Sequence, residues 1–477
     1  MNIVNKNIKK NNSFKNWFEM EKKKNLLRFL TCGSVDDGKS TLIGRLLHDT
    51  KMIYSDQLIS LKNDSKRHGT QGSKIDLSLL LDSLQSEKEQ GITIDVAYRY
   101  FSTNKKKFII VDTPGHIQYT RNMATGASNC DLAILLIDAS KGLLEQTKRH
   151  SFIVNLLGIK NFIIAINKMD VINYSKEVFL RIKNDFLIFS KKLSLKLNTE
   201  FIPISALSGE NVVYSTNLMP WYEGLTLLRY IESINLPSYF KKNTRFPIQY
   251  INRPNSNFRG YSGTLVSGSI NVGQKIKILP SFHSSYVKEI ITFDGKLNQA
   301  VSGQAITILL KDEIDISRGD CIVEYEAKVK TYDEAIVDLV WMDEEKLILG
   351  KSYNIKIAGK KIKACVKEII YKININNLNK EKQDFLCLND IGLIHIIFEE
   401  KIFFEKYIKN NILGGMIFID ILNNRTLAAG MIRKSKNNTF NSKKIVNKVF
   451  ELELNTFICK YFPHWKMNNL LQDWKKK

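Results

Sequence analysis

The sequence predicts an α/β domain with a doubly wound sheet, followed by two β-barrel domains. From about residue 26 to residue 234, apolar stretches of strand length alternate with segments of helical periodicity, which is the pattern of successive βαβ units. After residue 243 the apolar stretches become short and are separated by Gly, Pro, Asn and Asp, as in small barrels. A glycine-rich stretch at residues 33–40 lies between the first apolar stretch and a helical pattern, which is the context of a phosphate-binding loop.

The length of the chain is the reason to expect several domains. Its 477 residues exceed what one hydrophobic core usually serves. We predict an N-terminal extension, the α/β domain, two barrels and a linker with a tail, at residues 1–24, 25–240, 241–330, 331–433 and 434–477. The strand candidates that mark the barrels are residues 246–251, 263–268, 275–279, 304–308, 353–357, 361–375 and 416–420. In the last segment, residues 434–443 read as a polar linker, and residues 446–465 return an apolar and aromatic pattern.

The glycine-rich loop reads Gly-Ser-Val-Asp-Asp-Gly-Lys-Ser. Its glycines let backbone N–H groups turn toward phosphate oxygens at a helix N-terminus, where the helix dipole favours anions. Lys39 can reach the β- and γ-phosphates, and the Ser40 hydroxyl can coordinate Mg²⁺. We therefore assign phosphate contacts to the whole loop, which comprises Gly33, Ser34, Val35, Asp36, Asp37, Gly38, Lys39 and Ser40.

A second motif ends the apolar stretch at residues 108–111. An acid at the C-terminal tip of a strand can hold the metal, usually through water, and this is the role expected of Asp112. The N–H of Gly115 can contact the γ-phosphate. The residues assigned to the nucleotide here are Asp112, Thr113, Pro114, Gly115 and His116.

Two further motifs select the base. Asp170 follows the apolar stretch 162–166, and its carboxylate can accept from both the ring N–H and the exocyclic amine of guanine, whereas adenine would face it with a lone pair. Charge-assisted hydrogen bonds contribute about 1.5–3 kcal/mol each, so two of them favour GTP over ATP by roughly a hundredfold or more. The base contacts assigned are Asn167, Lys168, Met169 and Asp170, with Ser205, Ala206 and Leu207 from a loop whose backbone touches the base. Because all these motifs occur in order at strand ends, the sequence predicts GTP binding.

Two residues are candidates for a switch and for catalysis. Thr93 is placed to give Mg²⁺ a second hydroxyl and to sense the γ-phosphate, or else it only begins the β-rich stretch 94–101. His116 can orient the attacking water, as glutamine does in other GTPases, or it is structural. The predicted catalytic residues are Lys39, Thr93 and His116, and the predicted Mg²⁺ ligands are Ser40, Thr93 and Asp112.

The composition indicates a cytoplasmic protein. No apolar stretch approaches the roughly 20 residues of a membrane span, and the first 16 residues lack the apolar core of a signal peptide. The six cysteines are scattered without a C-x-x-C pair, which argues for a reducing compartment. The net charge of +23 comes mostly from lysine and accompanies abundant Asn and Ile, a pattern that an A/T-rich genome produces without nucleic-acid binding. We therefore expect neither a membrane nor a nucleic acid as partner.

The predicted layout, a GTPase domain before two barrels, resembles that of the elongation factors that deliver aminoacyl-tRNA. Gly-Ile-Thr-Ile at residues 91–94 and Asp-Thr-Pro-Gly-His at residues 112–116 are similar to that superfamily. Other stretches resemble the large subunit of bacterial ATP sulfurylase (sulfate adenylyltransferase), and Asp36-Asp37 stands where the tRNA-delivering factors have Asp-His. These stretches are residues 63–72, 95–101, 118–128, 252–254, 258–261, 315–320 and 462–465.

This resemblance implies a function that the residues alone do not give. The family works as a heterodimer in which the small ATP sulfurylase subunit makes adenylyl sulfate and pyrophosphate from ATP and sulfate, while the large subunit hydrolyses GTP. Ile117 departs from the family, which usually has an acid after His116. Two alternatives stay open: an elongation factor that binds aminoacyl-tRNA, and a switch protein that only recruits partners.

Overall fold

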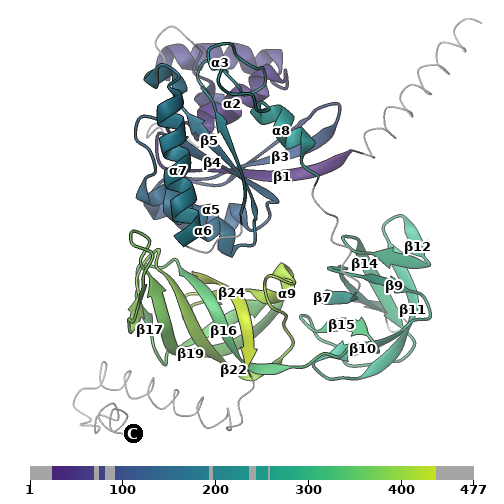
Figure 1. The fold of residues 1–477 in the computed structure, drawn as a ribbon. Coiled ribbons are helices and arrows are strands. Elements are labelled where there is room, and N and C mark those ends of the chain that lie inside the picture. Colours follow the sequence, from purple (N-terminus) through teal and green to yellow (C-terminus); the bar gives the residue numbers. More distant parts are fainter. Residues whose placement is uncertain are drawn as a thin grey trace, which may run out of the picture. The chain divides into compact units, whose positions relative to one another are not determined.

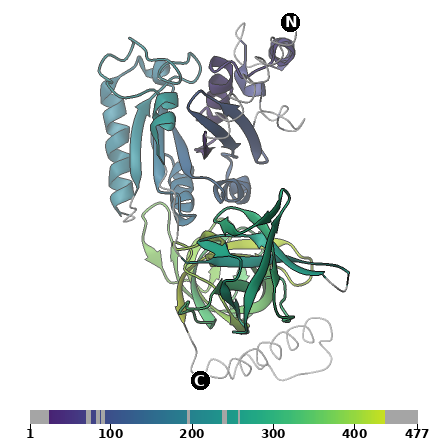
Figure 2. The ribbon, with the colours of Figure 1, turned by 90° about the vertical axis from the view of Figure 1, so that its right-hand side faces the viewer.

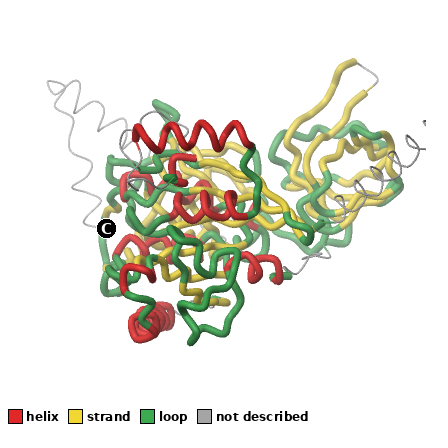
Figure 3. Tube along the Cα trace, turned by 90° about the horizontal axis from the view of Figure 1, so that it is seen from above, coloured by secondary structure: helices red, strands yellow, loops and turns green. Residues whose placement is uncertain are grey.

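The computed structural model describes residues 24–68, 75–80, 87, 92–192, 197–235, 243–255 and 258–436. The chain divides into two compact units, Met1–Leu236 and Pro237–Lys477 (Figure 1). Among the described residues, helices concentrate in the first unit and the second is built almost wholly of strands (Figure 3). No helix in this described part is long and apolar enough to cross a membrane.

The first unit contains a six-stranded sheet in the order β2-β3-β1-β4-β5-β6. Its strands are β1 (Asn25–Cys32), β2 (Ala97–Ser102), β3 (Lys106–Asp112), β4 (Leu132–Asp138), β5 (Asn161–Asn167) and β6 (Asn198–Pro203). Only the edge strand β2 is antiparallel to its neighbour, and the other pairings are parallel. Strand β4 is buried along its whole length because helices cover both faces of the sheet, as expected of a parallel sheet (Figure 2).

The helices of this unit form two layers. They are α2 (Lys39–Asp49), α3 (Ser55–His68), α5 (Thr120–Ala127), α6 (Glu145–Leu156), α7 (Lys176–Lys192) and α8 (Leu227–Ser233), with 3₁₀ turns η1 (Leu77–Leu80), η2 (Ile117–Tyr119) and η3 (Met169–Ile172). The apolar faces of α2 and α8 share one core cluster with the sheet. Helices α5 and α6 contact each other on the opposite face (Figure 1). The predicted doubly wound α/β domain is thus confirmed.

The second unit begins with a closed antiparallel barrel. Its strands are β7 (Arg245–Asn255), β8 (Phe258–Thr264), β10 (Lys275–Leu279), β11 (Ser284–Thr292), β12 (Gly295–Leu297), β14 (Ala305–Leu310) and β15 (Cys321–Glu324), beside a small ladder of β9 (Ser269–Asn271) and β13 (Gln299–Val301). The order is β10-β15-β7-β8-β14-β11-β12, and pairing of β10 with β11 closes the ring. The strand predicted at 263–268 is wrong beyond Thr264. There the chain turns, and Gly268 takes a φ of +76° so close to Thr244 that a Cβ would lie 2.6 Å from its nitrogen.

A second closed barrel follows. Its strands are β16 (Tyr332–Trp341), β18 (Ser352–Ile357), β19 (Lys360–Ile373), β20 (Lys380–Glu381), β22 (Ile391–Ile402), β23 (Gly415–Ile419) and β24 (Thr426–Lys436), with the short pair β17 (Leu347–Ile348) and β21 (Phe385–Leu386) and the helix α9 (Asn411–Gly414). Pairing of β18 with β19 closes the order β18-β23-β24-β16-β22-β19-β20. A small apolar cluster joins the two barrels, formed by Leu279, Cys321, Val323 and Leu413. The prediction of two barrels is confirmed.

The start predicted for the polar linker at residue 434 is wrong. Strand β24 continues through Lys436, because the backbones of Lys434 and Lys436 pair with Ile336 and Glu334 of β16 while the lysine side chains face water. The predicted boundary between residues 433 and 434 therefore falls inside a strand. The remainder of that linker, the aromatic stretch 446–465 and the N-terminal extension up to residue 23 lie outside the described residues.

Candidate functional site

The candidate phosphate loop connects β1 to α2. Asp37 fixes its curvature, because its Oδ2 accepts from the N–H of Ser34 at 2.6 Å. Asp36 and Gly38 have left-handed backbones, with φ of +65° and +90°. A Cβ at Gly38 would lie 2.4 Å from Nδ2 of Asn167, so glycine is required where the loop enters the helix. Val35, half-buried beside Asp36, lies at the tip.

Lys39 is the cation of this loop. Its side chain is buried, and its Nζ donates to the carbonyl oxygens of Ser34 at 2.7 Å and Gly33 at 3.4 Å. Burial lowers the pKa of Lys39, although the nearby charges of Asp37 and Asp112 oppose that shift. A Cβ at Gly115 would lie 2.3 Å from the Lys39 Nζ, so the glycine of the second motif is in close approach to the ammonium. The structure thus brings the first two predicted motifs together.

Two of the three predicted Mg²⁺ ligands meet directly. The Ser40 and Thr93 hydroxyl oxygens lie 3.4 Å apart. Asp112 ends β3 beside Thr31 of β1, whose hydroxyl donates to Asp112 Oδ1 at 3.2 Å. The neighbouring Thr113 is buried and donates its hydroxyl to the carbonyl of Thr31 at 2.7 Å.

The segment that carries Thr93 is held by a buried acid that sequence reasoning missed. Oε1 of Glu87 accepts from the N–H of Ile94 at 2.9 Å and of Asp95 at 3.2 Å, and Asn122 donates to the carbonyl of Ile94 at 2.8 Å. Strand β2 begins only at Ala97. The alternative that Thr93 merely begins a strand is therefore wrong, because side chains rather than a β-ladder hold this segment.

His116 follows Pro114 and Gly115, which are buried, and is itself half-buried. Its Nδ1 accepts from the N–H of Gln118 at 3.3 Å and so caps η2. Its ring lies 5.8 Å from that of Tyr119. The departure from the family pattern, Ile117, is 45% exposed.

Asn167 links three motifs that the sequence analysis treated separately. Its Nδ2 donates to the carbonyl of Asp37 at 2.8 Å, and its Oδ1 accepts from the N–H of Ala206 at 2.9 Å. The amide is 2% exposed, so both contacts are sheltered from water. The phosphate loop and both candidate base loops therefore meet at the carboxyl end of β5, the edge at which α/β sheets bind ligands.

The residues after Asn167 are those assigned to the base by the sequence analysis. Lys168 has a left-handed φ of +61°, and its Nζ lies 2.8 Å from Oδ2 of Asp138. Burial alone would raise the pKa of Asp138, but hydrogen bonds from Lys168 and Ser140 leave it below its usual value. Met169 is fully buried and donates its N–H to the carbonyl of Ile204 at 3.2 Å.

Asp170 presents a carboxylate oxygen that lacks a donor. Its Oδ1 is buried and has no hydrogen-bond partner among the described residues. An unsatisfied buried acceptor costs about 1–3 kcal/mol, so the orientation favours a ligand that donates to it. The N–H groups of guanine meet that requirement.

The third candidate loop is fixed from α2. Nε of Arg45 donates to the carbonyl of Ala206 at 3.2 Å, and its Nη2 donates to the carbonyl of Leu207. The buried Ser205 accepts from the N–H of Ser208 at 3.3 Å. Arg45 was not predicted, because nothing in the sequence indicates that α2 reaches a loop so distant along the chain.

Helix α6 braces the phosphate loop and was also missed. The Thr147 hydroxyl lies 2.9 Å from that of Ser34, and Nδ1 of His150 accepts from the N–H of Gly33 at 3.3 Å. His150 is fully buried, and burial with the charge of Lys39 lowers its pKa to about 3. Its Nε2 lies 3.0 Å from the amide of Gln146.

The same network continues toward His116. The Gln146 amide donates to the Thr120 hydroxyl at 3.3 Å, and that hydroxyl donates to the carbonyl of Ile117 at 2.8 Å. The sequence signal for this network is weak: it consists of the polar residues Thr147 and His150 at three-residue spacing, with Gln146 four residues before His150, in a half-buried helix.

The fold and this arrangement define a P-loop GTP-binding domain of the translation-factor kind. The family model for the elongation factor Tu GTP binding domain matches residues 24–241, and the model for the GTP-eEF1A C-terminal domain-like family matches residues 334–433. Among solved structures, Sup35 complexed with GDP is 20% identical with a TM-score of 0.40, covering 87% of this chain and 95% of that chain.

Similarity to curated proteins is much higher. Sulfate adenylyltransferase subunit 1 of Buchnera aphidicola subsp. Acyrthosiphon pisum is 59% identical over 466 residues, covering 98% of each chain. The protein of the same name from Erwinia tasmaniensis is 56% identical over 471 residues, covering 98% of this chain and 99% of its own. That from Cronobacter sakazakii is 56% identical over 465 residues, covering 97% and 98%. The chain belongs to the sulfate adenylyltransferase subunit 1 family, and the predicted resemblance to the large subunit of ATP sulfurylase is confirmed.

Proposed function

We propose that this chain is the GTP-hydrolysing subunit of a heterodimeric sulfate adenylyltransferase and works in the cytoplasm. Its partner would be the small subunit, which forms adenylyl sulfate and pyrophosphate from ATP and sulfate. The relatives that match this chain over nearly its whole length are named subunit 1. That name supports an enzyme of more than one subunit. The observation that carries the GTP assignment is the buried, donor-free Oδ1 of Asp170 on a loop that Asn167 ties to the phosphate loop.

GTP would be bound from three sides. The N–H groups of the phosphate loop and the Lys39 ammonium would contact the phosphates, and Asp170 would accept from the guanine ring. The backbone of Ala206 and Leu207, fixed by Arg45, would touch the base.

The residues present also suit a Mg²⁺ ion. Mg²⁺ prefers hard oxygen ligands and is usually held by few protein groups together with phosphates and water. The paired hydroxyls of Ser40 and Thr93 would supply two ligands, and Asp112 would contact the ion through water. The ion's charge would stabilise the negative charge that builds on the phosphate oxygens during transfer.

Hydrolysis needs an oriented water and a signal that the γ-phosphate has gone. His116 would orient the water from the segment that follows Gly115. Thr93 would report the γ-phosphate, because the segment that carries it depends on a few side-chain contacts rather than on a β-ladder.

Coupling to GTP hydrolysis answers a thermodynamic problem. Sulfate is a feeble nucleophile, and the anhydride in adenylyl sulfate is very high in free energy, so its formation from ATP lies far toward reactants. An assembly that requires GTP hydrolysis for product release would move the overall equilibrium toward adenylyl sulfate.

A reconstituted mixture tests this function. The intact chain, the small subunit, ATP, sulfate and GTP are combined, and adenylyl sulfate and GDP are measured together. We expect adenylyl sulfate beyond the level reached without GTP, and GTP turnover faster than that of the chain alone. The variant Thr93→Ala should lower this coupling more than it lowers GTP affinity. Equal adenylyl sulfate with and without GTP would contradict the proposal, and a stable complex with aminoacyl-tRNA would favour an elongation factor.

A further inference from the structure

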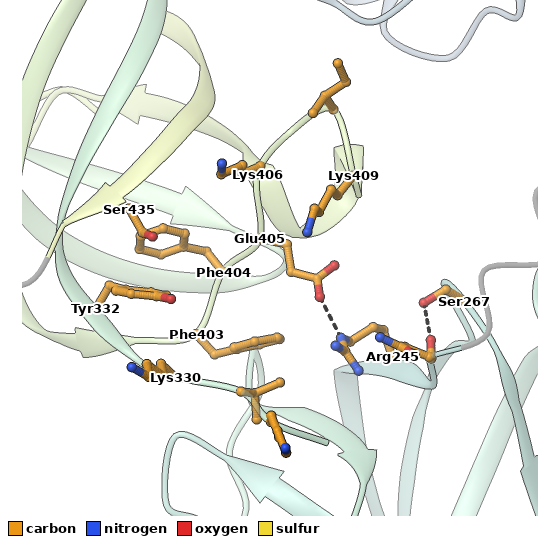
Figure 4. A pocket seen from close by; sticks show the side chains of 14 residues that line it. Arg245, Ser267, Lys330, Tyr332, Phe403, Phe404, Glu405, Lys406, Lys409 and Ser435 are labelled. Atoms are coloured by element: carbon orange, nitrogen blue, oxygen red, sulfur yellow. Dashed lines mark hydrogen bonds and ion pairs between the residues drawn. The ribbon is translucent and has the colours of Figure 1, made fainter. Parts of the chain in front are cut away.

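A pocket of about 590 Å³ lies in the second unit, where the two barrels meet (Figure 4). The first barrel contributes Arg245 of β7, and the second contributes the residues after β22 and Tyr332 of β16. Arg245 and Glu405 form an ion pair of 2.8 Å across this junction, and the Arg245 side chain is 5% exposed. The pocket lining therefore includes a fixed ion pair with no net charge.

The rim of the pocket is strongly basic. Four of its lining residues are lysines, Lys328, Lys330, Lys406 and Lys409. All four are exposed, and none has an ion-pair partner among the described residues. Glu405 carries the one carboxylate among the described lining residues, and Arg245 already neutralises it. Four unpaired positive charges thus surround one depression, which favours an anionic occupant.

The pocket also offers apolar surface at this rim. Ile408 is 74% exposed between the two lysines of its loop. The aromatic side chains, by contrast, are already engaged. The rings of Tyr332 and Phe404 lie 5.3 Å apart, and the Arg245 guanidinium lies 5.8 Å from the ring of Phe403.

We propose that this pocket, defined by the four lysines and Ile408, is the docking site for an acidic segment of the small adenylyltransferase subunit. The inference rests on the proposed function, because it assigns the partner a place on this chain. The lysines would attract the acidic residues of the segment, and Ile408 would contact an apolar residue among them. The ion pair would hold the two barrels together, so that Lys328 and Lys330 of the segment between the barrels keep their places relative to Lys406 and Lys409 of the second barrel.

The chemistry of the lining favours an acidic protein segment over a nucleic acid. Single-stranded nucleic acids bind through stacking of bases on aromatic rings in addition to phosphate contacts. Here the rings contact one another or an arginine. The positive charges available to a ligand are those of lysines, because the lining arginine, Arg245, is paired with Glu405. Lysine attracts carboxylates as a point charge, whereas bidentate recognition of phosphate needs the planar guanidinium group of arginine.

The test compares two variants of the full-length chain with equal charge change. The pocket variant carries Lys328→Gln, Lys330→Gln, Lys406→Gln and Lys409→Gln. The control variant carries the same change at four exposed lysines elsewhere on the second barrel, Lys356, Lys361, Lys363 and Lys367. Affinity for the purified small subunit is measured by calorimetry at low and high salt, with intrinsic GTP hydrolysis as the check on folding. We expect the pocket variant to lose about tenfold or more in affinity at low salt and much less at high salt, because salt screens exposed charges.

A second pair of variants tests the apolar contact. Ile408→Ala should weaken binding at both salt concentrations, whereas Leu422→Ala, at a 91% exposed turn of the same barrel, should not. Equal affinity of the pocket and control variants would overturn the docking site. The docking site would also be overturned if the pocket variant kept its affinity for the small subunit but lost affinity for single-stranded RNA, measured in parallel. If the wild-type chain itself does not bind the small subunit, the proposed assembly falls together with this inference.

Discussion

Asp170 is the residue on which the choice of base depends in the proposed site. Its buried Oδ1 has no donor among the described residues, so substitution changes the ligand and leaves the protein's own hydrogen bonds there intact. Asp170→Asn replaces one acceptor with a donor. The variant should lose GTP affinity by about a hundredfold and gain affinity for xanthosine triphosphate. Competition binding with both nucleotides measures this, and unchanged GTP affinity would remove Asp170 from the site.

His116 separates binding from hydrolysis. Its ring caps η2 and lies beside Tyr119, and among the described residues no hydrogen bond joins it to Lys39 or to the phosphate loop. His116→Ala should leave GTP affinity within a few-fold and slow hydrolysis by about 10²-fold, the size of effect of an aligning or acid–base group. Single-turnover hydrolysis is the measurement. His116→Gln should restore part of the rate, and full activity of the alanine variant would make His116 structural.

His150 makes stability depend on pH. Its pKa falls from 6.5 to about 3 on folding, so between these values only the unfolded chain binds the proton. His150 therefore lowers the free energy of unfolding very little above pH 6.5. As the pH falls, protonation of the unfolded chain lowers that free energy by roughly 2 kcal/mol between pH 7 and pH 5. Asp37 has the opposite effect on stability. Burial raises its pKa from 3.8 to about 6, so between these values only the folded chain binds the proton, and stability from this group declines as the pH rises.

Comparison of variants isolates this effect. His150→Gln keeps an acceptor for the Gly33 N–H but cannot bind a proton, so its urea midpoint should decline less on acidification than that of wild type. His283→Gln, at an exposed position, serves as the control and should follow wild type. Parallel pH profiles for wild type and His150→Gln would mean that His150 is not the group that titrates.

The segment that carries Thr93 depends on Glu87 for its position. Two N–H groups donate to one buried carboxylate oxygen, and β2 begins only three residues after Ile94. Glu87→Ala should therefore displace Thr93 and slow GTP hydrolysis by about tenfold or more, since charge-assisted hydrogen bonds contribute about 1.5–3 kcal/mol each. GTP affinity should change less than the rate.

Two controls accompany that prediction. Glu87→Gln retains a carbonyl oxygen as acceptor and should restore part of the rate. Asp56→Ala removes an exposed acid from the first turn of α3 and should change nothing. If the alanine variant hydrolyses GTP at the wild-type rate, Glu87 does not position Thr93.

Prediction from sequence succeeded where the chemistry is local. The phosphate loop could be identified because glycines, Lys39 and Ser40 must follow one another at the end of a strand. The contacts that assemble the site could not, because they join distant parts of the chain. His150 lies 117 residues from Gly33, and Arg45 lies 161 residues from Ala206. Such pairs depend on how α2 and α6 pack on the sheet.

The errors in strand limits have the same origin. The end of β8 depends on the close approach of Gly268 to Thr244. Thr244 directly precedes β7, so this contact joins two separate parts of the chain. The polar linker predicted from residue 434 overlaps the end of β24, because a run of exposed lysines does not by itself distinguish a linker from an outer strand. Strand pairing uses the backbone, so exposed lysines on an outer face are compatible with a ladder that continues to Lys436.

The three large sheets of the described part of the chain differ in whether they close. Each barrel joins its first and last main strands, through β10 with β11 and β18 with β19, whereas the sheet of the first unit ends at β2 and β6. Backbone amides on an open edge have no partner strand, while those in a closed ring are bonded on both sides. In deuterium-exchange experiments, label should therefore enter the first unit through β2 and β6, while the six main strands of each barrel take it up late and nearly together.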